Sequence, residues 1–335
     1  MPGTSPKITV AGVGAIGGWI GAKLAIAGEQ VSVLARGDTL KLVRAEGLRL
    51  GDKGEEFVAM VEAADNAAAL GPQDLLIVAV KAPALPKLAP ELEPLIGPET
   101  RIVPMLNGVP WWFVEGEPLQ SVDPDGGTSR ALPLDRVIGC VVHASSSRSA
   151  PNRIMVNHAD KLILGEPHGG TSDRIAGLCA LFERSGIRCE QSEDVRRAIW
   201  YKLWGNATIN PLSALTRATC DLILADPECR AWMLAGMAEL AQVGAAIGCP
   251  ISESGEDRMK VTARLGAFKT SMFQDVEAGR PIELEALLGA PREIASRHGI
   301  ATPALDRLYG VTRLLAEALG LLPSLSREGE GVGGG

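Results

Sequence analysis

The stretch that decides the fold runs from Lys7 to Arg36 and reads KITVAGVGAIGGWIGAKLAIAGEQVSVLAR. Residues 7–11 form a short, partly β-branched apolar run that is typical of a buried strand, and small residues to about Ala27 predict a helix. Gly28 then ends that helix, and residues 31–35 predict the next strand. This order predicts a βαβ unit with parallel strands.

Three glycines in the turn after the first strand follow the spacing GxGxxG: Gly12, Gly14 and Gly17. The first permits a tight turn, the second lets the backbone approach a pyrophosphate, and the third lets the helix pack closely on the strand. A phosphate would meet the N–H groups of Ala15, Ile16 and Gly17 at the helix N-terminus. A purely structural turn is the alternative, but the flanking strand and helix favour dinucleotide binding.

The end of the second strand predicts which dinucleotide binds. An NAD site places an acidic residue there for the ribose 2′-hydroxyl, whereas this chain has Arg36, followed by Asp38. Because a guanidinium can bind a 2′-phosphate, we expect NADPH or NADP+ as the cofactor. A solvated loop charge at Arg36 is the alternative interpretation, and Asp38 leaves NAD open.

Further apolar runs extend the α/β pattern. Strands are predicted at residues 74–83, 101–110 and 136–145, although Pro104 weakens the second of them. The segment 111–133 is rich in Gly, Pro and Asp and predicts a long loop. Strands that alternate with helical stretches predict a Rossmann-type, doubly wound parallel sheet.

Helical patterns replace strand signals from about residue 193, which predicts an all-α second domain. The expected helices span Val195–Ile209, Glu228–Ile247, Ser254–Ala278 and Leu284–Arg297. We expect three parts: an NADP-binding domain in residues 1–190, a helical substrate domain in residues 191–323 and a disordered tail in residues 324–335.

Composition and charge exclude several classes of function. With 335 residues, 46% hydrophobic and 22% charged, the chain suits a globular protein of about two domains. A net charge of −7 argues against a nucleic-acid partner. The sequence has neither a membrane-spanning apolar run nor a signal-peptide pattern, so we expect no membrane partner and a cytoplasmic location. The six cysteines and four histidines show no ligand spacing, which predicts reduced thiols and no metal site.

Two polar residues follow predicted strands directly, where ligands of open α/β sheets bind. Lys81 follows the run LLIVAV, and Asn107 follows VPML. A solvated lysine and a turn-forming Asn-Gly pair are the alternatives. Their shared placement beside the cofactor cleft favours a functional role.

A polar stripe marks the stretch Trp200–Thr216, WYKLWGNATINPLSALT. Lys202, Asn206 and Asn210 lie four residues apart and span an arc of roughly 80° on a helix. An exposed face is one interpretation, but the neighbours are small or apolar, and burying a lysine among them is costly. A stripe that faces a cleft fits better, because burial lowers the pKa of a lysine from ~10.4 towards neutrality and makes it a usable proton donor.

Two further expectations concern the ends of this helix and a second polar group. Ser192 can cap the helix, and Pro211 ends or kinks it after Asn210. Downstream, Ser271 offers a hydroxyl in an apolar frame, and Glu283 follows Pro281. For Glu283 alone, an acidic group in the first turn of a helix is the simpler interpretation.

Five pieces of the chain, in this order, resemble the ketopantoate reductase (2-dehydropantoate 2-reductase) family: GVGAIGG, VKAP, LNGV, WYKLWGNATINPLSALT and KTSMFQDVEAGRPIELEALLG. They cover nearly the whole chain, and the pair KxxxNxxxNP and TSMxQDxxxGRxxE is specific in combination. The resemblance implies NADPH-dependent reduction of a 2-keto acid to a 2-hydroxy acid. The type substrate is ketopantoate, which is reduced to pantoate in pantothenate and coenzyme A biosynthesis.

The resemblance also implies roles for single residues. Lys202 falls on the family's proton-donating lysine. The positions that match substrate-binding residues are Asn206, Asn210, Ser271 and, on the long helix, Glu239. The positions that match cofactor-side residues are Lys81, Asn107 and Glu283. Cys220 is a departure, because the family can carry a polar substrate-binding group near that position.

Two other functions remain open from the sequence. A β-hydroxyacid dehydrogenase also pairs a helix lysine with an asparagine four residues later, but the TSMxQD stretch favours the reductase. A non-catalytic NADPH-binding sensor would have no need of a proton donor. The apolar helix at residues 231–247 could support a homodimer.

Overall fold

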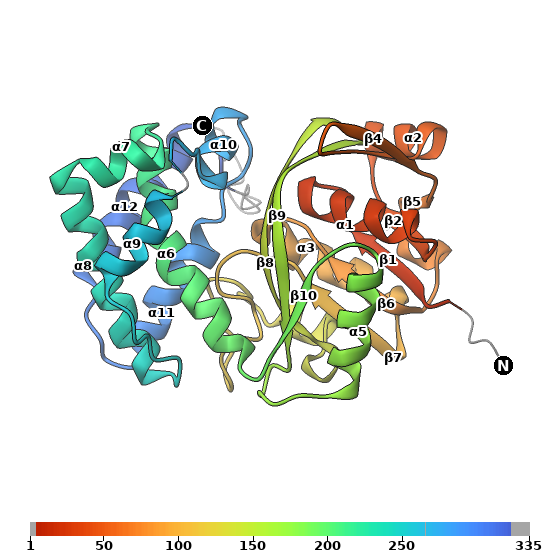
Figure 1. Cartoon of the computed structure of the whole chain (residues 1–335). Helices are drawn as coiled ribbons and strands as arrows, with labels where there is room; N and C mark the ends of the chain where they lie inside the picture. The colour runs from red at the N-terminus through yellow and green to blue at the C-terminus, as the bar shows by residue number, and fades with distance from the viewer. Residues whose placement is uncertain (1–4, 265, 323–335) are drawn as a thin grey trace, which may run out of the picture.

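A computed structural model describes residues 5–264 and 266–322 (Figure 1). Figure 1 shows the strands on one side of the molecule and a group of helices, formed by the second part of the chain, on the other. The predicted α/β class, with a parallel sheet first and helices after it, is confirmed. The expected disordered tail, residues 324–335, lies outside the described residues.

The first sheet is entirely parallel, and its strand order is β5-β2-β1-β6-β7. The strands are β1 (Lys7–Ala11), β2 (Gln30–Leu34), β5 (Glu62–Ala64), β6 (Gln73–Val78) and β7 (Ile96–Pro104). Pro104 is compatible with β7 because it is the last residue of the strand. The order reverses between β1 and β6, and ligands of such sheets bind beyond the strand ends at that point.

A second sheet was not predicted from the sequence. It has the order β10-β9-β3-β4, and β8 pairs with β9. Its strands are β3 (Leu48–Asp52), β4 (Glu55–Ala59), β8 (Gly139–Ala150), β9 (Arg153–Gly165) and β10 (Cys189–Ser192). A parallel bridge between Ile102 and Val137 connects β7 to the segment that leads into β8. The predicted strand at residues 136–145 is therefore part of this second sheet.

The helices around the sheets are mostly short. They are α1 (Ala15–Ile26), α2 (Gly37–Glu46), α3 (Leu85–Leu88), α4 (Gly127–Ala131) and α5 (Asp173–Arg184). Short 3-10 helices cover Ala67–Ala69, Ala82–Ala84, Ala89–Leu95 and Leu134–Arg136. Gly28, with a φ of +89°, follows α1 as expected.

The second part of the chain is helical. Its helices are α6 (Val195–Thr216), α7 (Cys220–Ala225), α8 (Pro227–Ala246), α9 (Gly255–Ala263), α10 (Ser271–Glu277), α11 (Ala290–Arg297) and α12 (Pro303–Ala318). A π-helical turn, Glu285–Gly289, precedes α11. No helix among residues 5–264 and 266–322 is both long and apolar enough to cross a membrane.

The predicted end of α6 and its predicted N-cap were wrong. The helix does not end at Asn210 but continues through Pro211 to Thr216. The residues just beyond the proline are buried, so packing outweighs the lost backbone hydrogen bond. The N-cap is Asp194, which accepts from the Arg197 N–H, while Ser192 accepts from the N–H of Asp194 instead.

One other predicted helix was too long, and a second has its predicted bounds but an irregular first turn. The pattern at residues 254–278 is divided into α9 and α10, because Thr270 caps a new helix by accepting from the Phe273 N–H. The predicted helix at residues 284–297 is helical over its whole range, with the π-helical turn in its first part and α11 in the rest.

The predicted long loop at residues 111–133 is irregular up to α4, but it is not a solvated loop. Trp111, Trp112 and Phe113 are buried, and the Phe113 ring stacks on Trp200 of α6 with centroids 5.8 Å apart. These rings belong to the same apolar cluster as the helices of the second part. The segment therefore helps to hold the two parts of the chain together.

Candidate active site

The glycine turn has the geometry that a dinucleotide site requires. Gly12 has a φ of +103°, and a Cβ there would lie 2.7 Å from Val80. A Cβ on Gly17 would lie 2.0 Å from the carbonyl oxygen of Gly12, so only glycine permits this approach of α1 to the turn. Both positions therefore require glycine for reasons internal to the protein.

Gly14 differs, because a Cβ there would meet no atom closer than 3.9 Å. Space is left above the turn at the residue that precedes α1, where a ligand's phosphates can approach the backbone. Gly14 is the N-cap and offers no side chain to the first N–H groups of the helix, those of Ala15, Ile16 and Gly17. These donors and the helix dipole suit the diphosphate of NADPH.

Arg36 lies at the predicted place, at the end of β2 and the start of α2. Its guanidinium is mostly exposed and forms an ion pair with Glu91. Asp38 is also exposed and pairs with Lys41. The position suits a 2′-phosphate, which would compete with Glu91 for the guanidinium.

Lys202 is half-buried where α6 meets the segment after β7 and the first residues of β8. Its ammonium donates to Asn107 Oδ1 at 3.0 Å and to the carbonyl of Val142 at 2.8 Å. Burial lowers the pKa of Lys202, and the negative charge of Glu283 opposes that shift only in part. The arrangement provides a lysine that gives up its proton more readily than a solvated one.

Glu283 connects the strand ends to the helical part. Its carboxylate accepts from the Asn107 amide at 3.1 Å and lies 3.4 Å from the ammonium of Lys81. Lys81 also forms a 2.6 Å ion pair with Asp275 of α10. Although burial lowers the pKa of Lys81, the two carboxylates outweigh burial and raise it. A continuous polar network thus runs from Asp275 to Lys202.

Asn107 and Gly108 form a turn and also contribute a polar group to the site, so both interpretations of this pair are correct. Gly108 has a φ of +79°, and a Cβ there would lie 2.3 Å from the carbonyl oxygen of Ala286, so a turn is required. The same turn directs the Asn107 amide towards Lys202 and Glu283.

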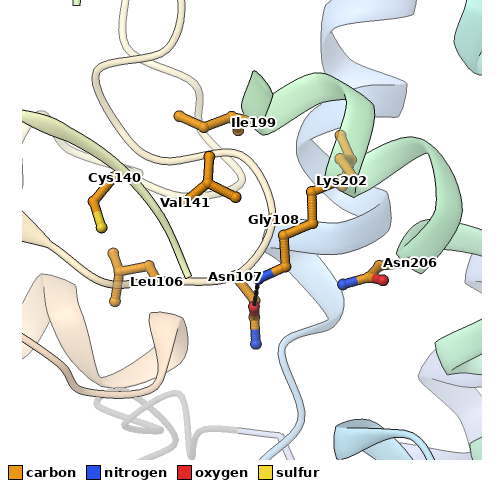
Figure 2. A pocket seen from close by; sticks show the side chains of 9 residues that line it. Leu106, Asn107, Gly108, Cys140, Val141, Ile199, Lys202 and Asn206 are labelled. Atoms are coloured by element: carbon orange, nitrogen blue, oxygen red, sulfur yellow. Dashed lines mark hydrogen bonds between the residues drawn. The ribbon is translucent and has the colours of Figure 1, made fainter. Parts of the chain in front are cut away.

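Figure 2 shows Lys202 extending from α6 to Asn107, with Asn206 one turn further along the same helix. Lys202, Asn107 and Asn206 line one pocket together with Leu106, Gly108, Cys140, Val141, Ile199 and Leu203. The structure therefore brings together residues that are about 100 positions apart in the sequence. Apolar side chains surround the polar groups, which suits a small organic substrate.

Two predicted substrate residues do not line this pocket. Asn210 is 5% exposed and lies one turn beyond Asn206 on α6. Ser271 is half-buried as the first residue of α10, four positions before Asp275. Cys220 is buried at the start of α7, where burial raises the pKa of its thiol to about 11.

The structure argues against the substrate role predicted for Glu239. Its two carboxylate oxygens accept from the N–H groups of Ala304 and Leu305, at 2.8 and 3.0 Å, at the start of α12. An acidic residue on a long helix matched the family pattern, but both of its oxygens are engaged in capping another helix.

Sequence reasoning missed three groups near the site. Asp275 lies inside the TSMFQD stretch, but nothing in that stretch indicates its ion pair with Lys81. His143 of β8 is half-buried, and burial, followed by the charges of Lys202 and Lys161, lowers its pKa to about 4. Arg148, also of β8, donates to the carbonyl of Val13 in the glycine turn at 3.4 Å. His143 and Arg148 lie near the site because of the register of β8, which cannot be read from the sequence.

Comparisons with known proteins point to one family. Models described as ketopantoate reductase PanE/ApbA and its C-terminal part match residues 8–169 and 194–316. A 2-dehydropantoate 2-reductase from Mesorhizobium japonicum is 40% identical over 318 residues, which are 92% of this chain and 98% of that protein.

Two solved structures share the fold over almost their whole length. A Ralstonia solanacearum protein assigned as a ketopantoate reductase has a TM-score of 0.92 and 50% identity, covering 95% of this chain and 100% of that one. The 2-dehydropantoate 2-reductase from Methylococcus capsulatus has a TM-score of 0.82 and 31% identity, covering 95% and 99%. The glycine turn lies in the range matched by one family model, and Lys202 lies in the range matched by the other. The chain therefore belongs to the ketopantoate reductase family.

Proposed function

We propose that this protein reduces a 2-keto acid to the corresponding 2-hydroxy acid with NADPH, and that 2-dehydropantoate is its substrate. The observation that carries the proposal is the half-buried Lys202, whose ammonium donates to Asn107 and which lines one pocket with Asn206, in a chain 40% identical to a 2-dehydropantoate 2-reductase. The family match supports the reaction class, and the pocket supports the placement of its chemistry.

NADPH, when bound, supplies the hydride that reduces C2 of the keto acid. The turn of Gly12, Gly14 and Gly17 would hold the diphosphate at the start of α1. Arg36 would bind the 2′-phosphate, and Lys81 and Asn107 would lie beside the nicotinamide at the ends of β6 and β7.

Lys202 would act as the general acid. Reduction of a carbonyl places negative charge on its oxygen, which an ammonium can stabilise and then protonate. Because burial already lowers the pKa of Lys202, transfer of its proton costs less than transfer from a solvated lysine. Asn107 and the carbonyl of Val142 fix the direction of the ammonium.

Three residues would orient the substrate: Asn206, Asn210 and Ser271. Asn206 lines the pocket and can both donate and accept hydrogen bonds. Asn210 and Ser271 would contact substrate only if the helical part moves towards the sheet when ligands bind. Glu239 is not included, because its carboxylate caps α12.

We further propose two properties of the whole protein. Six free cysteines, five of them buried, suit the reducing cytoplasm, where NADPH is also available. The exposed face of α8 is rich in alanine, which would let two copies approach closely as a homodimer. Light scattering during size-exclusion chromatography tests the dimer.

The function is tested by following NADPH oxidation with 2-dehydropantoate and with a panel of branched 2-keto acids. We expect turnover with 2-dehydropantoate to exceed that with the others. NADP+ reduction by 3-hydroxy acids, without keto-acid reduction, would instead indicate a β-hydroxyacid dehydrogenase. Tight NADPH binding without any turnover would indicate a sensor and would overturn the proposal.

A further inference from the structure

Arg258 of α9 lies beside the polar stripe of α6 but has no part in the chemistry above. Its guanidinium carbon is 5.5 Å from the centroid of the Tyr201 ring. A Cβ on Gly205 would lie 2.6 Å from Arg258 Nη2, so the side chain rests directly on the helix at that point. Glycine inside a helix costs up to about 1 kcal/mol relative to alanine, and here it makes room for the guanidinium.

The contact between Arg258 and Gly205 is next to the residues of α6 that line the proposed active site. Gly205 directly precedes Asn206 and follows Lys202 by three residues, so the three residues span about one turn of α6. The charge of Arg258 contributes, after burial and the nearer lysines, to the lowered pKa of His143 on β8. Arg258 and Lys202 therefore act on the same histidine from two different helices.

The guanidinium has unused hydrogen-bonding capacity. Nη1 donates weakly to Thr262 Oγ1 at 3.4 Å, and the buried Nε has no partner within the described part of the chain. In residues 5–264 and 266–322, no carboxylate lies within ion-pair distance of Arg258. The nearby Glu253 is engaged with the Tyr201 hydroxyl at 2.8 Å. Arginine carries five donors, so this guanidinium can bind an anion without giving up an existing ion pair.

We propose that Arg258 binds the carboxylate of the substrate, an inference that rests on the proposed function. A 2-keto acid carries its carboxylate on the carbon next to the carbonyl, so the two groups need adjacent partners on the protein. Lys202 serves the carbonyl oxygen, and the planar guanidinium matches a carboxylate through two parallel hydrogen bonds. Arg258 would thus select acids over neutral ketones.

The test compares a 2-keto acid with its own methyl ester, which lacks the negative charge. With wild-type protein we expect kcat/KM to be higher for the acid. Arg258→Gln should lower kcat/KM for the acid about 10- to 100-fold, mainly through KM, as expected for loss of a charge-assisted hydrogen bond. The ester should change little, and Arg258→Lys should restore part of the loss.

Two controls separate binding from folding. Lys260→Gln removes an exposed charge from the same helix and should leave both substrates unaffected. The Kd for NADPH, measured by fluorescence, should not change in Arg258→Gln. An equal loss for acid and ester, or no loss at all, would overturn the role of Arg258. If the wild type reduces no 2-keto acid, the proposed function itself fails and the inference falls with it.

Discussion

At the scale of single residues, the protonation of Lys202 should set the pH dependence of the reaction. Burial lowers the pKa of Lys202, and only the protonated ammonium can donate. We therefore expect kcat/KM to fall as pH rises through that lowered pKa, below the ~10.4 of a solvated lysine. Lys202→Met should remove this limb and lower kcat about 10²- to 10⁴-fold. Unchanged turnover by the variant would exclude the role.

A variant of Glu283 provides a second test of the pH dependence that we attribute to Lys202. Glu283 opposes the effect of burial on Lys202, so Glu283→Gln should lower the pKa of the lysine further. The basic limb of the profile should then move to lower pH. A limb that stays in place would mean that another group titrates there.

Arg36 predicts a preference between cofactors. If its guanidinium binds the 2′-phosphate, Arg36→Gln should raise the KM for NADPH about 10- to 100-fold, because a charge-assisted contact is lost. The KM for NADH, which has no such phosphate, should change little. Arg44→Gln on the same helix α2 is a matched control, since Arg44 donates to the carbonyl of Ala63 instead. An equal effect on both cofactors would contradict the assignment.

Site residues could be predicted from the sequence where they lie close together in the chain. Lys202 and Asn206 could be placed on one face because helical periodicity is a local property. Arg258 could not, because nothing in the sequence indicates that α9 crosses α6 at Gly205. The same limit hid Asp275, whose partner Lys81 is 194 positions away.

At the scale of elements, Glu239 should stabilise α12 rather than act on substrate. Glu239→Ala would leave the buried N–H groups of Ala304 and Leu305 without acceptors, which costs about 1–3 kcal/mol each. We expect a lower melting temperature with an unchanged KM for the keto acid. Gln242→Ala, at an exposed position of the same helix α8, is the control and should melt like the wild type. A raised KM at unchanged stability would restore the substrate role.

Element boundaries were predicted where local signals act alone. Gly28 ended α1 as expected, because a positive φ at that point favours glycine. Pro211 did not end α6, because buried side chains beyond it favour continuation of the helix. The break before α10 depends on the Thr270 cap, which the apolar pattern of residues 254–278 conceals. Tertiary packing therefore decided the boundary at Pro211, whereas a local cap decided the start of α10.

At the scale of the whole molecule, the sequence predicted four of the five strands of the first sheet and the helical half, but neither β5 nor the second sheet. The central strands β1 and β6 of the first sheet contain apolar runs that are easy to detect. β9, in contrast, is largely exposed in its middle and carries polar side chains such as Asn157 and Asp160. Its pairing with β3, about 100 residues earlier, is a long-range contact without a local signal.

The segment 111–133 contributes to the whole molecule because hydrogen bonds connect it to α11. Glu293 accepts from the N–H groups of Gln120 and Ser121, each at 2.9 Å, and from the Ser121 hydroxyl at 2.6 Å. Arg297 donates to the carbonyls of Glu117 and Pro118. Although burial raises the pKa of Glu293, the hydrogen bonds from Ser121 and Gln120 outweigh it and lower that pKa.

Glu293→Ala should therefore lower the free energy of unfolding by about 1–3 kcal/mol and open the segment to proteolysis. Because the folded pKa of Glu293 lies below that of the unfolded chain, the contribution is present above the ordinary value near 4.3. It is lost as pH falls through the folded pKa, so the melting temperatures of variant and wild type should converge in acid. Glu317→Ala, which removes an exposed ion pair with Arg313, is the control and should change stability by less than about 1 kcal/mol. If the stability difference between Glu293→Ala and the wild type stays the same at low pH, the Glu293 carboxylate does not hold the segment against α11.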